Sequence, residues 1–159
     1  MLENIVSFLK ELVGQGKPFQ TSYMTIPGIG TGSAYASGEA FGTIFELQVP
    51  KRGIIDMAIM LDLDDEGIQT ELWLFSEKFT PTADNNAFAV TDNDLMNLQV
   101  IISVSAFANA NVNQVGINNG LHIPYFAPKG ILYCQCVTRG VPNIAAGHLP
   151  LVRLSGYER

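Results

Sequence analysis

Two carboxylates near the middle of the chain are placed where they could act together on a substrate. Asp62 and Glu71 lie in two apolar runs on either side of a turn at residues 64–67, a pattern that predicts a β-hairpin. With Leu63 opposite Ile68, the two carboxylates lie diagonally across the hairpin, roughly 7 Å apart. That spacing suits the carboxylate pair of a glycosidase. Because the sequence shows no aromatic-lined cleft beside them, a solvated acidic face is the favoured interpretation.

The same turn resembles the start of a calcium-binding loop, with Asp62, Asp64 and Glu66 in alternation and a glycine after them. A complete loop of this type ends in a bidentate glutamate at its twelfth position, and helices flank it. Here the twelfth position is Trp73, and the flanking runs have the pattern of strands. The sequence therefore predicts no metal centre, with a weak adventitious cation site as the alternative.

A hydrolase of the Ser-His-Asp type needs a histidine base that a carboxylate orients. His122 and His148 have no acidic neighbours in sequence, and residues 95–157 contain no Asp or Glu. An orienting carboxylate would have to come from the acidic segment at residues 56–94. We therefore predict no catalytic residues and expect that the protein is not an enzyme.

No segment of the sequence predicts a cofactor. The glycines at residues 28–32 superficially resemble a phosphate-binding loop, but no strand precedes them, no helix follows and no Lys-Ser/Thr pair completes the motif. Cys134 and Cys136 share one face of a predicted strand, too far apart for an unstrained disulfide. Only two histidines are present to complete a metal site with them. We predict that both cysteines are small buried hydrophobic residues.

The elements that position these residues begin with a predicted amphipathic helix at residues 2–13. Its apolar stripe consists of Leu2, Ile5, Leu9 and Leu12, at the three-four spacing of a helix. Glycines and a proline within residues 14–18 end it. A helix of this length is marginal alone, so the stripe is expected to bind its own domain, copies of itself or another protein. Residues 17–33 show no periodic run and predict an extended arm that reaches up to roughly 50 Å.

From residue 34 onward the pattern is that of an all-β domain. The apolar runs between turn residues are 34–37, 43–49, 54–63, 68–75, 98–107, 114–118, 121–126, 130–138 and 149–155. About eight short strands without crossover helices predict an antiparallel β-sandwich, and residues 91–97 predict one helical turn with Thr91 or Asp92 as its N-cap. The chain thus divides into a helix and arm at residues 1–33 and a β-sandwich domain at residues 34–159.

The predicted hairpin register also assigns two faces. The face expected in the core consists of Met57, Ile59, Leu61, Leu63, Ile68, Thr70, Leu72 and Leu74. On the opposite face, Met60, Trp73 and Phe75 form an apolar patch that this fold or a partner must cover. A slip of one residue would exchange the two faces. These three residues and the helix stripe are the candidate partner-binding residues.

Only 15% of the 159 residues are charged, well under the roughly 25% of ordinary soluble domains. Residues 56–94 hold ten acids and one base, whereas residues 95–157 hold only Lys129, Arg139 and Arg153. Nine scattered bases do not predict nucleic-acid binding, and no apolar run approaches the ~20 residues that span a bilayer. No export signal is visible, so we expect folding in a cytoplasm. The uncharged last third favours contact with protein, because such a surface is easily desolvated.

An ordered set of short segments runs through residues 35–155. They are Tyr35-Ala-Ser-Gly-Glu-Ala-Phe-Gly42, Leu72-Trp-Leu-Phe75, the loop from Thr80 to Leu95, Leu132-Tyr133 and Thr138-Arg-Gly-Val-Pro142. This set resembles a group of small tailed-bacteriophage virion proteins, some of which are jelly-roll head decoration (cement) proteins. Glu39 stands where that group more often has Asp. Residues 1–33 lie outside the resemblance, so their role is inferred from physical arguments alone.

The resemblance implies a jelly-roll-like virion protein of the head surface, made in the host cytoplasm, that binds the major capsid protein and stabilises the shell. A cement protein performs no chemistry and links neighbouring capsomers through many weak contacts. We expect a homotrimer joined through residues 95–157, with the N-terminal arm reaching a neighbouring subunit or shell protein. The alternative is a carbohydrate-binding or host-attachment module of a phage tail or fibre, with Trp73, Tyr125 and Tyr133 as a candidate aromatic platform.

Overall fold

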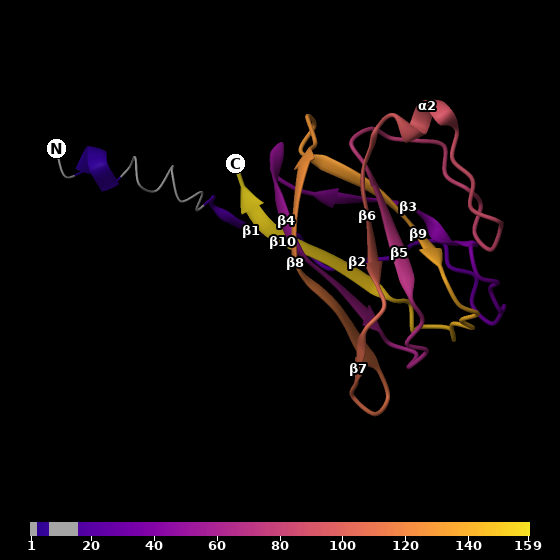
Figure 1. Cartoon of the computed structure of the whole chain (residues 1–159). Helices are drawn as coiled ribbons and strands as arrows, with labels where there is room; N and C mark the ends of the chain where they lie inside the picture. Colours follow the sequence, from indigo (N-terminus) through magenta and orange to yellow (C-terminus); the bar gives the residue numbers. More distant parts are fainter. Residues whose placement is uncertain (1–2, 7–15) are drawn as a thin grey trace.

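Short strands with apolar residues at alternating positions fold here into two antiparallel sheets that pack face to face (Figure 1). A computed structural model describes residues 3–6 and 16–159. The elements are β1 Pro18–Gln20, β2 Met24–Thr25, β3 Ala40–Gln48, β4 Arg52–Asp62, β5 Thr70–Phe75, α2 Asp92–Leu95, β6 Leu98–Val104, β7 Phe107–Asn109, β8 Gln114–Phe126, β9 Ile131–Thr138 and β10 Leu151–Glu158. The predicted all-β class with antiparallel sheets is confirmed.

One sheet, here called the β4 sheet, has the strand order β1-β10-β4-β8-β7, and β2 also pairs with β10. The other, the β5 sheet, has the order β3-β9-β5-β6. Each strand points one row of side chains into the space between the sheets. The large side chains buried there include Phe41, Leu47, Ile55, Leu72, Leu74, Ile102, Leu132 and Leu154. This single core holds the two sheets together.

Most predicted apolar runs fall on observed strands, but three features differ. Residues 34–37 form no strand, the run 98–107 divides between β6 and β7, and the runs 114–118 and 121–126 join as the single strand β8. β8 continues because Gly120 and His122 adopt positive φ angles of 67° and 49°, at a point where its register with β4 shifts. The predicted helical turn is present as α2, and the side chain of Thr91 caps it by accepting from the backbone N–H of Asp94.

The segment predicted as an extended arm joins the sandwich for most of its length. β1 and β2 pair with β10, and Ile26 and Ile29 lie in the core. The sandwich therefore begins at Pro18 instead of residue 34. Strands of two and three residues bounded by proline and glycine are too short to give an alternating pattern, so the sequence does not reveal them.

The predicted hairpin between the fourth and fifth strands is wrong. β4 pairs with β10 and β8, whereas β5 pairs with β6 and β9, so the turn at residues 64–67 connects the two sheets. On β5, Leu72 and Leu74 face the core as predicted. On β4 the predicted faces are reversed, because Ala58 and Met60 lie in the core and Ile59 lies on the other side of the strand. Both faces of β4 are apolar, and the alternation alone cannot choose between them.

Residues 3–6 are helical, and Ile5 is 50% exposed. The other residues of the predicted stripe, Leu2, Leu9 and Leu12, lie outside the described residues. In the part of the chain that the structure describes, no helix is long and apolar enough to cross a membrane.

Candidate interaction surfaces

The outer face of the β5 sheet is covered by the protein's own chain. Residues 76–91, which connect β5 to α2, lie beside this sheet (Figure 1). The ring of Phe88 packs on Trp73 with centroids 4.9 Å apart, and that of Phe79 packs on Phe75 at 4.1 Å. Phe75 is completely buried and Trp73 is half-buried. Neither residue forms the predicted partner-binding patch, because the fold itself supplies the cover.

Two side chains fasten this covering segment to the sandwich. The carboxylate of Asp84 accepts hydrogen bonds from the N–H groups of Gly30 (2.8 Å) and Gly42 (2.7 Å) and from the hydroxyl of Tyr35 (2.8 Å). The completely buried Gln135 bonds to the backbone of the same segment through both ends of its amide. Burial and the nearby Asp84 carboxylate raise the pKa of Tyr35, so its hydroxyl remains a donor at neutral pH.

Met60, the third residue of the predicted patch, lies in the core between the sheets. Its assignment as a partner-binding residue fails with the hairpin register from which it came. Three residues of β4 that the sequence placed in the core, Met57, Ile59 and Leu61, instead face outward from the β4 sheet. This exchange creates a surface that the sequence does not predict.

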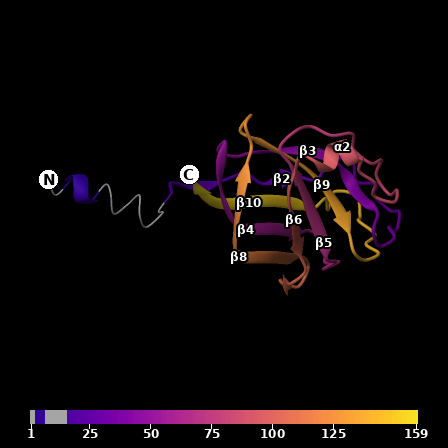
Figure 2. The ribbon, with the colours of Figure 1, turned by 45° about the horizontal axis from the view of Figure 1, so that its top comes forward.

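The outer face of the β4 sheet is built from three cross-strand rows on β10, β4 and β8, which run side by side in Figure 2. The rows are Leu151-Leu61-Val115, Arg153-Ile59-Ile117 and Ser155-Met57-Asn119. We call the six apolar members, Met57, Ile59, Leu61, Val115, Ile117 and Leu151, the outer sheet face. None of them belongs to either hydrophobic core cluster of the described chain. An antiparallel sheet normally turns polar residues to solvent on such a face, so this one is unusually apolar.

Arg153 is the one charged residue in the three rows. Its guanidinium carbon lies 4.3 Å from the centre of the Tyr23 ring, a cation–π arrangement. Its Nε is buried without a hydrogen-bond partner among the described residues. The arginine therefore lies flat on the sheet, where its stem adds to the apolar surface.

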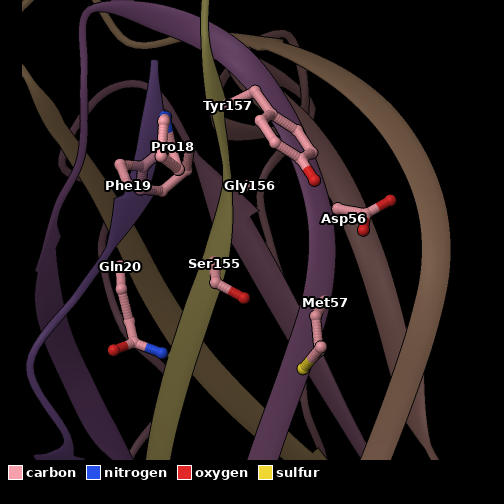
Figure 3. Close-up of a pocket in the computed structure, with 8 residues that line it drawn as sticks. All are labelled: Pro18, Phe19, Gln20, Asp56, Met57, Ser155, Gly156 and Tyr157. Carbon is pink, nitrogen blue, oxygen red and sulfur yellow. The ribbon is translucent and has the colours of Figure 1, made fainter. Parts of the chain in front are cut away.

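A shallow concavity of about 400 Å³ continues the outer sheet face towards β1 (Figure 3). Phe19, Asp56, Met57, Ser155 and Tyr157 are among its lining residues. Met57 and Ser155 also form part of the third row, so the concavity and the outer sheet face are one continuous surface.

A second surface is defined by charge. Residues 95–126, which include β6, β7 and β8, contain no Asp, Glu, Lys or Arg, and we call this the uncharged side. Its exposed large apolar side chains are Leu95, Met96, Ile101, Val112, Ile117 and Phe126. Two amides join its edges: Gln99 accepts from the N–H of Phe126 (2.9 Å), and Asn118 donates to the carbonyl of Ser103 (2.8 Å). The uncharged side therefore spans the edges of both sheets.

The candidate carboxylate pair is not formed. Asp62 is buried and accepts from the backbone N–H groups of Asp64 and Gly67, which is turn chemistry. Glu71 lies in the other sheet, 2.7 Å from the guanidinium of Arg139, which holds the pKa of that carboxyl below its usual range. The two candidate catalytic carboxylates therefore stabilise the fold.

Each histidine has a carboxylate partner that its sequence neighbours do not reveal. Nδ1 of His148 lies 3.0 Å from Asp64, and Nδ1 of His122 lies 2.9 Å from Asp56. Both carboxylates come from the acidic segment at residues 56–94. Within residues 3–6 and 16–159, no group of three or more His, Cys, Asp or Glu side chains could hold a metal ion.

The remaining candidates are buried. Tyr125 and Tyr133 lie within the fold, so together with the half-buried Trp73 they form no exposed aromatic platform for a carbohydrate. Cys134 and Cys136 are both free and completely buried, as predicted, and burial raises the pKa of the Cys134 thiol.

No protein-family model, curated protein or solved structure matches this chain.

Proposed function

We propose that this chain is a structural virion protein that binds and stabilises a phage capsid as a decoration (cement) protein. The resemblance of residues 35–155 to such proteins motivates the proposal. The strand order supports it. If the short β7 is left out, successive strands from β2 to β10 alternate between the two sheets, and the one exception is the β5–β6 hairpin. The resulting order, β2-β10-β4-β8 facing β3-β9-β5-β6, fits a jelly roll made of two Greek keys.

The observation that carries the proposal is the uncharged side. A solvated surface of this size ordinarily includes Lys and Glu, the residues that are depleted at the centres of protein interfaces. Here residues 95–126 have none of them and expose several large apolar side chains. Contact with the major capsid protein and with two further copies of the chain would bury this side. A homotrimer repeated over the head surface would then add many weak contacts to the shell.

Cosedimentation with capsids tests the proposal. Purified protein is mixed with phage heads that lack it, and the bound fraction is measured after pelleting. Met96→Asp and Phe126→Asp place a charge on side chains that are 76% and 58% exposed, so the fold should tolerate both changes. We expect each to lower the affinity for heads by about tenfold or more, because a charge must then be desolvated at the contact.

Val141→Asp is the matched control, because Val141 is equally apolar and 66% exposed but lies outside the uncharged side. It should bind as the unmodified protein does. Equal binding of all four proteins, or no binding by any, would contradict the proposal.

A further inference from the structure

The two sheets of the sandwich differ in how their outer faces are covered. Both faces are apolar, but residues 76–91 cover that of the β5 sheet through Phe79 and Phe88. On the β4 sheet, Ile117 is 45% exposed, the central Ile59 is only 8% exposed, and the other four members of the outer sheet face are half-buried. No segment of the described chain packs on this face as residues 76–91 pack on the other sheet. A sheet that is apolar on both faces needs a second cover.

We propose that the outer sheet face binds the N-terminal segment, residues 2–13, of a second copy of this chain. The inference rests on the proposed self-association and names the two surfaces that produce it. The sequence of this segment has apolar residues at Leu2, Ile5, Leu9 and Leu12, and the helix that this spacing predicts would carry Glu3, Lys10 and Glu11 on its opposite side. The stripe and the outer sheet face are therefore complementary in polarity.

The two surfaces also match in size. From Leu2 to Leu12 a helix rises about 15 Å. The three rows from Leu151 to Ser155 extend about 13 Å along β10, and the strands β10, β4 and β8 span about 10 Å across. One helix, about 10 Å in diameter, covers such a face, and the concavity beside Met57 extends it in the direction of β1 (Figure 3).

The point at which the segment meets the sandwich favours a second copy as the donor. β1 runs antiparallel to β10, with Pro18 opposite Tyr157, and the carbonyl of Lys17 accepts from the N–H of Glu158. The chain therefore enters the sheet at the last residues of β10, whereas the rows at Leu151 and Arg153 lie towards the first. Gly16, where the described part of the chain resumes, also lies against the Glu158 carbonyl, so the segment joins its own sandwich at the end of β10 farthest from Leu151.

Such a contact joins two different surfaces and is heterologous. Contacts of this kind close into a ring when the rotation between copies permits it. A ring of three would give the homotrimer of the proposed function, with each copy donating one segment and accepting another.

A complementation experiment with full-length variants tests the inference. Leu9→Asp disables the donated stripe and leaves the outer sheet face intact, whereas Ile117→Asp, at a half-exposed position, disables the face and leaves the stripe intact. Sedimentation equilibrium should show an oligomer for the unmodified protein. Each variant alone should be monomeric, with a dissociation constant raised about thirtyfold or more. The equimolar mixture should form a one-to-one complex, because one intact pair of surfaces remains.

The controls distinguish loss of the proposed contact from misfolding of a variant, and from binding of something else to the outer sheet face. Circular dichroism must show that each variant is folded, with Val115→Asp as a replacement if Ile117→Asp is not, and Val141→Asp must associate like the unmodified protein. Self-association of Leu9→Asp alone would show that the faces pair with each other and would overturn the inference. A monomeric unmodified protein would also overturn it, whether the segment binds its own face or a shell protein.

Failure of the inference is distinguishable from failure of the proposed function. Capsid binding by a monomeric protein would leave the cement role standing without segment exchange. Complementation without capsid binding would leave the exchange standing without the cement role.

Discussion

Removal of the Asp84 carboxylate is expected to be among the most destabilising single changes outside the hydrophobic core. Its two oxygens accept from Gly30, Gly42 and Tyr35 at 2.7–2.9 Å and so tie the covering segment 76–91 to the start of β3. In Asp84→Ala these donors lose a charged acceptor, each at a cost of roughly 1–3 kcal/mol. Gly30 keeps a second acceptor in the oxygen of Tyr35, 3.1 Å away, so we expect a total loss of about 4 kcal/mol.

For a domain of this size, that loss corresponds to a fall in Tm of roughly 8–16 °C. Asp84→Asn keeps one acceptor oxygen but turns an N–H₂ group towards a donor, and it should lose about half as much. Tyr35→Phe should lose roughly 1–2 kcal/mol, because it removes one donor and the second acceptor of Gly30.

Urea unfolding followed by tryptophan fluorescence measures these free energies. Trp73 is the single tryptophan and packs on Phe88 of the covering segment, so it reports directly on this part of the fold. Asp92→Ala is the control, since Asp92 is an exposed carboxylate at the start of α2 and should contribute under ~1 kcal/mol. If Asp84→Ala unfolds within ~0.5 kcal/mol of the unmodified protein, the fastening role of Asp84 is refuted.

Three further predictions concern an ion pair, the thiols and a glycine. Glu71→Gln should cost about 1 kcal/mol at neutral pH. Because Arg139 lowers the folded-state pKa of Glu71 from 4.5, this stability is present above about pH 4.5 and is lost as the pH falls through the folded-state pKa. The urea midpoints of the two proteins should therefore converge on acidification. Cys134 and Cys136 should not react with a thiol reagent in the native protein and should both react after denaturation, because both are completely buried. If the native protein reacts as fast as free cysteine does, their placement is contradicted. Gly42→Ala should cost roughly 3 kcal/mol or more in urea unfolding, since φ is +76° and a Cβ would lie 2.5 Å from the Pro27 carbonyl oxygen. Gly120→Ala, also at positive φ but with nothing within 4 Å of the added Cβ, should cost only about 1 kcal/mol; equal losses would contradict this placement of Gly42.

Most of the longer strands of this protein can be predicted, because apolar residues between turn residues mark them locally. The short β1 and β2 are the exceptions. The pairing of the strands cannot be predicted in this way, because it depends on contacts between distant segments. β4 takes as its partners β10 and β8, although β5 follows it after a turn that suits a hairpin. The faces of β4 are equally undetermined, since Met60 on one side and Ile59 on the other satisfy the same apolar pattern.

The same limit applies to the polar contacts. Nothing near Asp84 in sequence indicates its contact with Tyr35, which lies 49 residues earlier. The carboxylate partners of His122 and His148 are likewise distant in sequence. By contrast, short-range patterns predicted the burial of Cys134 and Cys136 correctly and narrowed the N-cap of α2 to Thr91 or Asp92, of which the structure has Thr91.

The central claim, a cement role on a phage head, is tested most directly by the copy number of this chain in purified virions, measured by quantitative mass spectrometry against the major capsid protein. A protein that decorates the whole shell through the uncharged side should be present in hundreds of copies per particle and should remain with heads separated from tails. Three to a few dozen copies that stay with the tails would contradict the cement role, and absence from the virion would exclude it.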